Sequence, residues 1–114
     1  MKTRVTMVAA AAAMMLAHPA LSQTDGDPAA GKQKTTMCTG CHGIPGYKSV
    51  FPSVYSVPKL GGQHAAYIVK ALQGYKTGTR THPSMRAIAA DLSDKDMADL
   101  AAYYAGAEAR TAAK

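Results

Sequence analysis

Hydrophobic residues in the third quarter of the chain recur at the spacing of an α-helix. Five apolar side chains occupy positions i, i+1, i+4, i+5 and i+8, which places them on one broad stripe of a helix. These residues are Tyr67, Ile68, Ala71, Leu72 and Tyr75. Gly61 and Gly62 precede the stretch, and Gly78 follows it where helices commonly end in a left-handed glycine. The pattern predicts a helix between these glycines.

A second apolar stripe marks the last helix of the chain. The segment Ser93–Asp96 resembles a capping box in which aspartate replaces the usual glutamate at the third helical position. The stripe behind it consists of Met97, Leu100, Ala101 and Tyr104. We expect a helix from this box to about Ala107, with a shorter helix over Met85–Ala90 before it.

The N-terminal half follows a different pattern. Asp27 followed by Pro28 is typical of a helix start, and the helix is expected to run to about Met37. Gly31 lies inside it at a cost of about 1 kcal/mol relative to alanine, so we expect another helix to approach closely there. Residues 43–59 contain three prolines and no sustained period, which predicts an ordered loop. No segment alternates as a strand. The expected fold class is all-α, with three main helices and a long middle loop.

The first 22 residues have the layout of a secretory signal peptide. Two basic residues precede Val5–Ala17, an uncharged apolar run, and Ala20–Ser22 offers small residues at the expected cleavage positions. The apolar run has 13 residues, fewer than the ~20 needed to span a bilayer. We therefore predict cleavage after Ser22, a domain over residues 23–114 and a periplasmic location. An uncleaved N-terminal membrane anchor is the alternative, and no other segment is apolar enough to span.

The composition describes one small domain with little material for a core. The 114 residues are 47% hydrophobic and 18% charged, with no Trp and one Phe. Such a chain is too apolar for a disordered tail. Two cysteines exclude a scaffold of several disulfides and a four-thiolate zinc site. Domains of this size often need a metal, a disulfide or a cofactor for stability, so we expect something besides aromatic side chains to fill the centre.

Both cysteines lie in one short motif. Residues 38–42 are Cys-Thr-Gly-Cys-His, which is the C-x-x-C-H pattern of haem attachment. Two thiols separated by two residues can each bond one vinyl group of the same porphyrin, and the adjacent histidine can then reach the iron. We therefore assign Cys38 and Cys41 to the attachment of one haem c through two thioethers, and His42 to the iron.

Three other interpretations of the motif are weaker. A thiol–disulfide redox centre normally accompanies a βαβ unit, which the sequence does not predict. A zinc site needs four ligands, and only scattered histidines could complete it. A plain structural disulfide explains neither the presence of His42 nor the poor core.

The mature chain resembles the class I c-type cytochromes along nearly its whole length. Gly31, followed by Lys32, stands seven residues before Cys38, as in short bacterial members of that family. The segment Val57–Gln63 is similar to the family's P-x-L-x-G segment, and Leu100–Tyr103 is similar to the L-x-x-Y of its last helix. The resemblance implies a cytochrome c fold, in which three main helices and a long loop wrap around one covalently attached haem.

The resemblance also implies roles for particular residues. Gly31 would lie where the first and last helices cross, against both ends of the Leu100–Tyr103 motif. The carbonyl of Pro58 would accept a hydrogen bond from the ring of His42, which strengthens the histidine as a ligand. Leu60 would pack on the haem ring.

Met85 is our prediction for the second iron ligand. It lies 43 residues after His42 in a stretch that completes no helical stripe, and Pro83 stiffens the approach to it. The resembling family has its distal methionine in this kind of position, between the middle and last helices. Met37 adjoins an attachment cysteine and cannot reach the opposite face of the ring, whereas Met97 belongs to the stripe of the last helix.

Two histidines remain as candidates for that position. His82, three residues before Met85, is the main rival ligand. His64 follows two glycines and a glutamine at a helix start, so we expect it to be a solvated or capping histidine.

An iron with protein ligands on both faces has no vacant position, and its remaining chemistry is one-electron transfer. We therefore predict an exported monohaem electron carrier rather than an enzyme. A thioether ligand and an apolar pocket favour the ferrous state and a moderately high potential. Two alternatives stay open. The chain could be the haem subunit of a larger dehydrogenase or oxidase complex, or a gas-binding haem sensor with a labile Met85.

The net charge of +6 falls to +4 when the predicted signal peptide is removed. Eight basic residues flank the proposed haem-binding segments: Lys32, Lys34, Lys48, Lys59, Lys70, Lys76, Arg80 and Arg86. They would form a basic face that steers the protein to redox partners with acidic docking faces, or they are simply solvated side chains. Export and the lack of a basic run interleaved with aromatic residues disfavour nucleic-acid binding.

Overall fold

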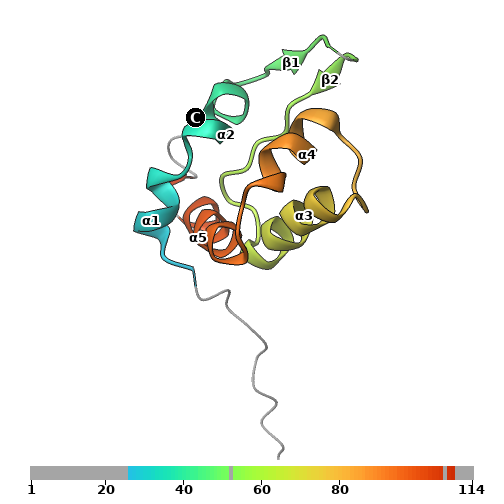
Figure 1. The fold of residues 1–114 in the computed structure, drawn as a ribbon. Coiled ribbons are helices and arrows are strands. Elements are labelled where there is room, and N and C mark those ends of the chain that lie inside the picture. Colours follow the sequence, from blue (N-terminus) through green and yellow to red (C-terminus); the bar gives the residue numbers. More distant parts are fainter. Residues whose placement is uncertain (1–25, 52, 107, 110–114) are drawn as a thin grey trace, which may run out of the picture.

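The computed structural model describes residues 26–51, 53–106 and 108–109. The predicted signal peptide, residues 1–22, lies outside the described residues. The described part is mostly helical, as predicted, with one small antiparallel sheet (Figure 1). Its elements are α1 (Pro28–Gln33), α2 (Thr36–His42), β1 (Lys48–Ser49), β2 (Tyr55–Ser56), α3 (Ala65–Thr77), α4 (Pro83–Ala90) and α5 (Asp94–Ala105).

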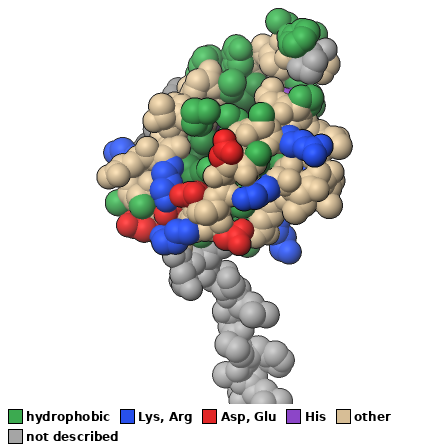
Figure 2. Space-filling model, in the orientation of Figure 1, with side chains coloured by type: hydrophobic (Ala, Val, Ile, Leu, Met, Phe, Trp, Pro, Cys, Tyr) green, Lys and Arg blue, Asp and Glu red, His purple; other side chains and the backbone are tan. Residues whose placement is uncertain are grey.

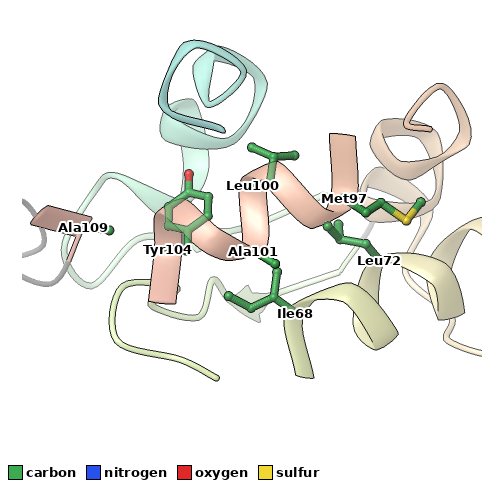
Figure 3. Close-up of a cluster of buried hydrophobic side chains, with 7 residues drawn as sticks. All are labelled: Ile68, Leu72, Met97, Leu100, Ala101, Tyr104 and Ala109. Carbon is green, nitrogen blue, oxygen red and sulfur yellow. The ribbon is translucent and has the colours of Figure 1, made fainter. Parts of the chain in front are cut away.

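Helix α5 is the centre of the helical packing. It packs against α1 and α3, and α3 also packs against α4 (Figure 1). The predicted stripe of α5 is buried and meets Ile68 and Leu72 of the predicted α3 stripe, whereas Tyr67 of that stripe is 50% exposed (Figure 3). The cluster consists of Ile68, Leu72, Met97, Leu100, Ala101, Tyr104 and Ala109. Each large side chain buried there contributes about 1.5–3 kcal/mol, so this cluster holds the helices together.

The C-terminal end of α3 and the start of α5 are those that the sequence predicts, whereas α5 ends at Ala105, two residues before the expected end. Gly78 follows α3 with a φ of 88°, a left-handed conformation that glycine adopts without steric cost. At the start of α5 the Ser93 hydroxyl accepts a hydrogen bond from the backbone N–H of Asp96, and the Asp96 carboxylate accepts one from the backbone N–H of Ser93. The predicted capping box is therefore confirmed.

Gly31 lies where α1 crosses α5, also as predicted. A Cβ at this position would stand 2.0 Å from the carbonyl oxygen of Asp99 and 3.0 Å from Cβ of Tyr103. Only a residue without a side chain permits this close approach of the two backbones.

A buried carboxylate fastens α1 to α5. The side chain of Asp99 is 1% exposed, and it accepts hydrogen bonds from the backbone N–H of Asp27 and from the ammonium groups of Lys34 and Lys95. The three oxygen–nitrogen distances are 2.8, 2.6 and 2.6 Å. These partners, Lys34 above all, hold the pKa of Asp99 far below the ordinary carboxyl value. The sequence pattern assigned no role to this residue.

Two expectations about the N-terminal half were wrong in detail. The single helix to about Met37 is instead two helices, α1 and α2, separated at residues 34–35. Lys34 caps α1, and its ammonium reaches Asp96 and Asp99 of α5, a distant contact that no local pattern reveals. The predicted loop contains a short hairpin, in which Lys48 pairs with Ser56 and Ser49 with Tyr55. Strands of two residues are too short to produce a detectable alternation.

Candidate haem site

Helix α2 carries the whole C-x-x-C-H motif and ends on its histidine. None of its seven residues is buried, so the helix lies at the edge of the fold and not in its core. Cys38 and Cys41 are three residues apart and therefore share one face of the helix. Cys38 is half-buried and Cys41 is exposed. Gly43 ends the helix, with its N–H donated to the carbonyl of Thr39.

The ring of His42 is oriented by a backbone carbonyl. Its Nδ1 lies 2.6 Å from the carbonyl oxygen of Pro58, which belongs to the extended segment between the hairpin and α3. A carbonyl can only accept, so Nδ1 carries the proton in this contact and Nε2 keeps its lone pair for a metal. This is the contact that the resemblance implied for these two residues.

Two hollows flank α2. One, of about 250 Å³, lies between α2 and α5, and the residues that line it include His42, Leu60, Tyr103 and Tyr104. The other, of about 440 Å³, lies between α2 and α4, and its apolar walls include Met37, Cys38, Ile88, Leu92 and Leu100. Figure 2 shows hydrophobic side chains gathered in this region between the two helices and along the hairpin. The space beside the motif is therefore largely apolar.

Met85 lies in the first turn of α4. It is half-buried and packs against the core cluster, as does Leu60. The sequence placed Met85 in a loop-like stretch before a short helix, whereas α4 begins two residues earlier, at Pro83. Pro83 occupies the first helical turn, where a missing N–H costs nothing.

The rival candidates have other surroundings. The ring of His82 caps α4, because its Nδ1 accepts a hydrogen bond from the backbone N–H of Met85 at 3.4 Å. The same ring meets the Tyr55 ring edge-on, with 4.9 Å between the two ring centres. His64 is the exposed N-cap residue of α3 and makes no side-chain capping bond. Met37 is 68% exposed, and Met97 is completely buried in the core, as its place in the stripe predicts.

The Tyr104 hydroxyl is a buried polar group with no hydrogen-bond partner among the described residues. It points toward the N-terminal helices (Figure 3). It lies close enough to the Cys38 thiol for each to affect the other's pKa, although no hydrogen bond of regular geometry joins them. Burial raises the pKa of both groups. An unpaired buried hydroxyl costs about 1–3 kcal/mol, so a group bound beside Cys38 that accepts or donates a hydrogen bond would stabilise this position.

The cytochrome c family model matches residues 28–106 of the chain. The chain belongs to the cytochrome c family. It is 42% identical over 85 residues to cytochrome c4 of Pseudomonas aeruginosa, covering 75% of this chain and 40% of the relative. It is 41% identical over 86 residues to cytochrome c-554(548) of Halomonas halodenitrificans, covering 73% of this chain and 99% of that protein.

A solved structure supports the same family. Reduced cytochrome c4 from Pseudomonas stutzeri superimposes with a TM-score of 0.52 at 38% identity, over 71% of this chain and 50% of that one. The chain thus has the cytochrome c fold and spans less than half the length of the cytochrome c4 sequence from Pseudomonas aeruginosa that it matches.

As a member of the cytochrome c family, the chain binds covalently attached haem c. The residues beside α2 fit this group. The two thiols share a helix face, the His42 ring has a free Nε2, the neighbouring walls are apolar, and the Tyr104 hydroxyl lacks a partner. Family membership therefore decides among the four interpretations of the cysteine motif. The individual roles of Cys38, Cys41, His42, Pro58, Leu60 and Met85 stay predictions.

The surroundings of several basic residues differ from the predicted basic face. Lys32 forms an ion pair with Glu108, Lys34 pairs with two carboxylates of α5, and Lys76 donates to the carbonyl of Leu92. Arg80 donates to the Tyr67 hydroxyl. These side chains make contacts within the cytochrome, and Lys32, Lys76 and Arg80 are also exposed to solvent.

Sequence reasoning missed three functional neighbours: Tyr104 beside Cys38, His82 as the cap of the Met85 helix, and Arg80 against α3. For His82 a signal existed, because a polar residue directly before proline is typical of a helix start. For Tyr104 and Arg80 the sequence offered no signal that we could use: Tyr104 lies 66 residues after Cys38, and Arg80 lies 13 and 5 residues after Tyr67 and Tyr75.

Proposed function

We propose that this cytochrome is an exported monohaem electron carrier whose iron is ligated by His42 and Met85. The observation that carries the proposal is the hydrogen bond between His42 Nδ1 and the Pro58 carbonyl, because it leaves Nε2 free and oriented for a metal. Haem c bound there supplies one-electron transfer between ferric and ferrous iron. His42 and Met85 would together hold the iron and leave it no site for a substrate, so the chain would act as a carrier rather than an enzyme.

Each proposed residue has a separate task. Cys38 and Cys41 hold the cofactor by thioethers from one face of α2, so that it stays bound outside the cytoplasm. Pro58 orients His42 through its carbonyl. Leu60, which lines the same hollow as His42, would pack on the haem ring and exclude water from the space beside the histidine. Met85, itself half-buried in the first turn of α4, would supply a soft sulfur that favours the ferrous state.

The proposed location and partners rest on the sequence. We propose that residues 1–22 are a cleaved signal peptide, that residues 23–114 form the exported domain, and that the carrier works in the periplasm. Within the part of the chain that the structure describes, no helix is long and apolar enough to cross a membrane. The positive charge would favour redox partners with acidic docking faces.

Replacing Met85 by alanine tests the proposed ligand. The Met85→Ala protein should lose the ferric sulfur-to-iron absorption band, and its potential should fall by an amount on the order of 0.1 V, because the axial ligand is a main determinant of haem potential. Met37→Ala is the matched control, since Met37 is 68% exposed and should leave both properties unchanged.

His82→Ala addresses the rival ligand. It should retain the sulfur-to-iron band, because the His82 ring is engaged with the Met85 backbone and with Tyr55. A Met85→Ala protein that keeps the band and the potential would contradict the proposal. Formation of a carbon monoxide adduct by the ferrous wild type would favour the gas-binding sensor instead.

The hairpin favours a second candidate, a haem subunit of a larger dehydrogenase or oxidase complex. Three apolar residues between or beside the two strands are highly exposed: Val50 at 78%, Phe51 at 84% and Val54 at 73%. An exposed apolar cluster of this kind is typical of an interaction site. Size-exclusion chromatography of the native cytochrome distinguishes the candidates. A free carrier would elute at the mass of one chain, whereas a subunit would elute at the mass of its complex.

A further inference from the structure

We propose that Arg80 is a positioning residue, which fixes the segment leading to Met85 against helix α3 and so keeps the methionine at its ligand position. The inference rests on the proposed function, in which Met85 ligates the iron. It concerns what holds the ligand in place and not which residue is the ligand.

The side chain of Arg80 is clamped by two tyrosines of α3. Its Nη1 donates to the Tyr67 hydroxyl at 3.0 Å. Its guanidinium carbon lies 4.9 Å from the centre of the Tyr75 ring and 5.7 Å from that of Tyr67. A guanidinium at these distances from aromatic rings is attracted by their π-electrons. One side chain thus makes three contacts with a single helix.

The backbone beside Arg80 is fastened to the same helix. The Gly74 carbonyl accepts hydrogen bonds from the N–H of Arg80 at 3.0 Å and from the Thr79 hydroxyl at 3.3 Å. A Cβ at Gly74 would come within 3.2 Å of the Thr79 hydroxyl and 3.4 Å of Arg80 Cγ. The absence of a side chain at Gly74 therefore allows this segment to lie directly on α3.

The other end of the segment is held at His82. Its ring contacts Tyr55 of the hairpin and caps α4 through the backbone N–H of Met85. Four residues separate Arg80 from Met85, and one of them, Pro83, has a restricted φ. A ligand at the end of so short a segment, anchored at both ends, has few alternative positions. Release of the Arg80 contacts would give Met85 more freedom to leave the iron.

Arg86 provides a charge-matched comparison. It is exposed on α4, directly after Met85, and carries the same charge as Arg80. A purely electrostatic effect on the iron site should be at least as large from Arg86 as from Arg80. A positioning effect should come from Arg80 alone, because only Arg80 has the two-tyrosine clamp among the residues that the structure describes.

The test measures how easily an external ligand displaces Met85 in the ferric holoprotein. The probe is imidazole, and its affinity and the loss of the sulfur-to-iron band are recorded together. We expect Arg80→Gln to raise the imidazole affinity about tenfold, as fits the loss of one hydrogen bond and the ring contacts. Tyr67→Phe, which removes the hydroxyl and keeps the ring, should raise it about threefold. Arg86→Gln should change it by less than about twofold.

Arg80→Lys sharpens the result, because lysine keeps the charge but not the planar group that bonds and stacks. Its imidazole affinity should be closer to that of Arg80→Gln than to that of the wild type. Equal affinities in Arg80→Gln and Arg86→Gln would overturn the inference, as would an unchanged Tyr67→Phe, which is conservative enough to fold if Arg80→Gln does not. A wild-type protein without the sulfur-to-iron band overturns the proposed Met85 ligation itself, so the two failures are distinguishable.

Discussion

Two regions of this cytochrome bury their hydrophobic residues in different ways. In the helix-packing region, formed by α1, α3 and α5, the chain covers its own apolar side chains: Met97 and Ala101 are completely buried and Leu100 is 2% exposed. In the attachment region, formed by α2, the β1–β2 hairpin and α4, Met37 is 68% and Phe51 84% exposed. The first region is completed by protein atoms, whereas the second leaves apolar side chains exposed.

The boundary between the regions shows the same contrast in polar groups. Asp99, in the helix-packing region, has three hydrogen-bond donors around its buried carboxylate. Tyr104 belongs to the same helix but faces the attachment cysteine, and its buried hydroxyl has no partner within the described residues. On the same helix, the buried polar group that faces α1 therefore has hydrogen-bond partners, whereas the one that faces Cys38 has none among the described residues.

The largest expected effect comes from removing both thiols. A Cys38→Ala, Cys41→Ala protein cannot hold haem covalently, and it should lose most of its helical circular dichroism at 25 °C. The reason is that only eight hydrophobic residues are buried among the described residues, too few to stabilise a domain of this size. Retention of the helical signal in this variant would mean that the helices fold without covalently bound haem.

Glycine substitutions give the next largest effect and compare the regions directly. Gly31→Ala should lower the free energy of unfolding by about 2–3 kcal/mol, because the new Cβ would meet the Asp99 carbonyl across the α1–α5 crossing. Gly40→Ala, on α2, is the comparison variant, since a Cβ there would meet no protein atom outside its own helical turns within 4 Å. Denaturant unfolding of the two holoproteins measures both values. Similar losses would show that α2 is packed as tightly as α1.

The smallest effect is a change in the acid dependence of stability. The pKa of Asp99 is lower in the folded chain than its unfolded value of about 3.9, so its contribution is full above that pH and is lost as the pH falls below it. Asp99→Asn should therefore be less stable at pH 7 and should lose less further stability between pH 5 and pH 3. Thermal unfolding across this range tests the prediction.

Asp91→Asn is the control for that experiment, because Asp91 is an exposed carboxylate on the α4 side. It should keep the acid dependence of the wild type. The stability of Asp99→Asn will still depend on pH, since Asp96 retains its ion pair with Lys34 and its own lowered pKa. If stability falls with acid as steeply in Asp99→Asn as in the wild type, then the hydrogen bonds of Asp99 do not link α1 to α5 as the structure indicates.

Local sequence was sufficient for the features that depend on neighbours within one or two helical turns. The stripe around Leu100, the cap at Ser93 and the stop at Gly78 are each specified by a few adjacent side chains, and the structure has them as predicted. The haem attachment motif is equally local, because two thiols and a histidine must lie within one turn to serve one porphyrin. Family membership confirms the cofactor that this motif predicts.

Contacts between distant segments decided the rest. The break between α1 and α2 accompanies the pairing of Lys34 with Asp99, 65 residues away, and the clamp on Arg80 depends on how the chain returns across α3. The orientation of His42 depends on a backbone carbonyl, a group that every residue carries and that sequence alone cannot place. Amino-acid order determines which local conformations are favourable. Tertiary packing determines which of these side chains meet, because contact energies between remote segments exceed the small differences among local conformations.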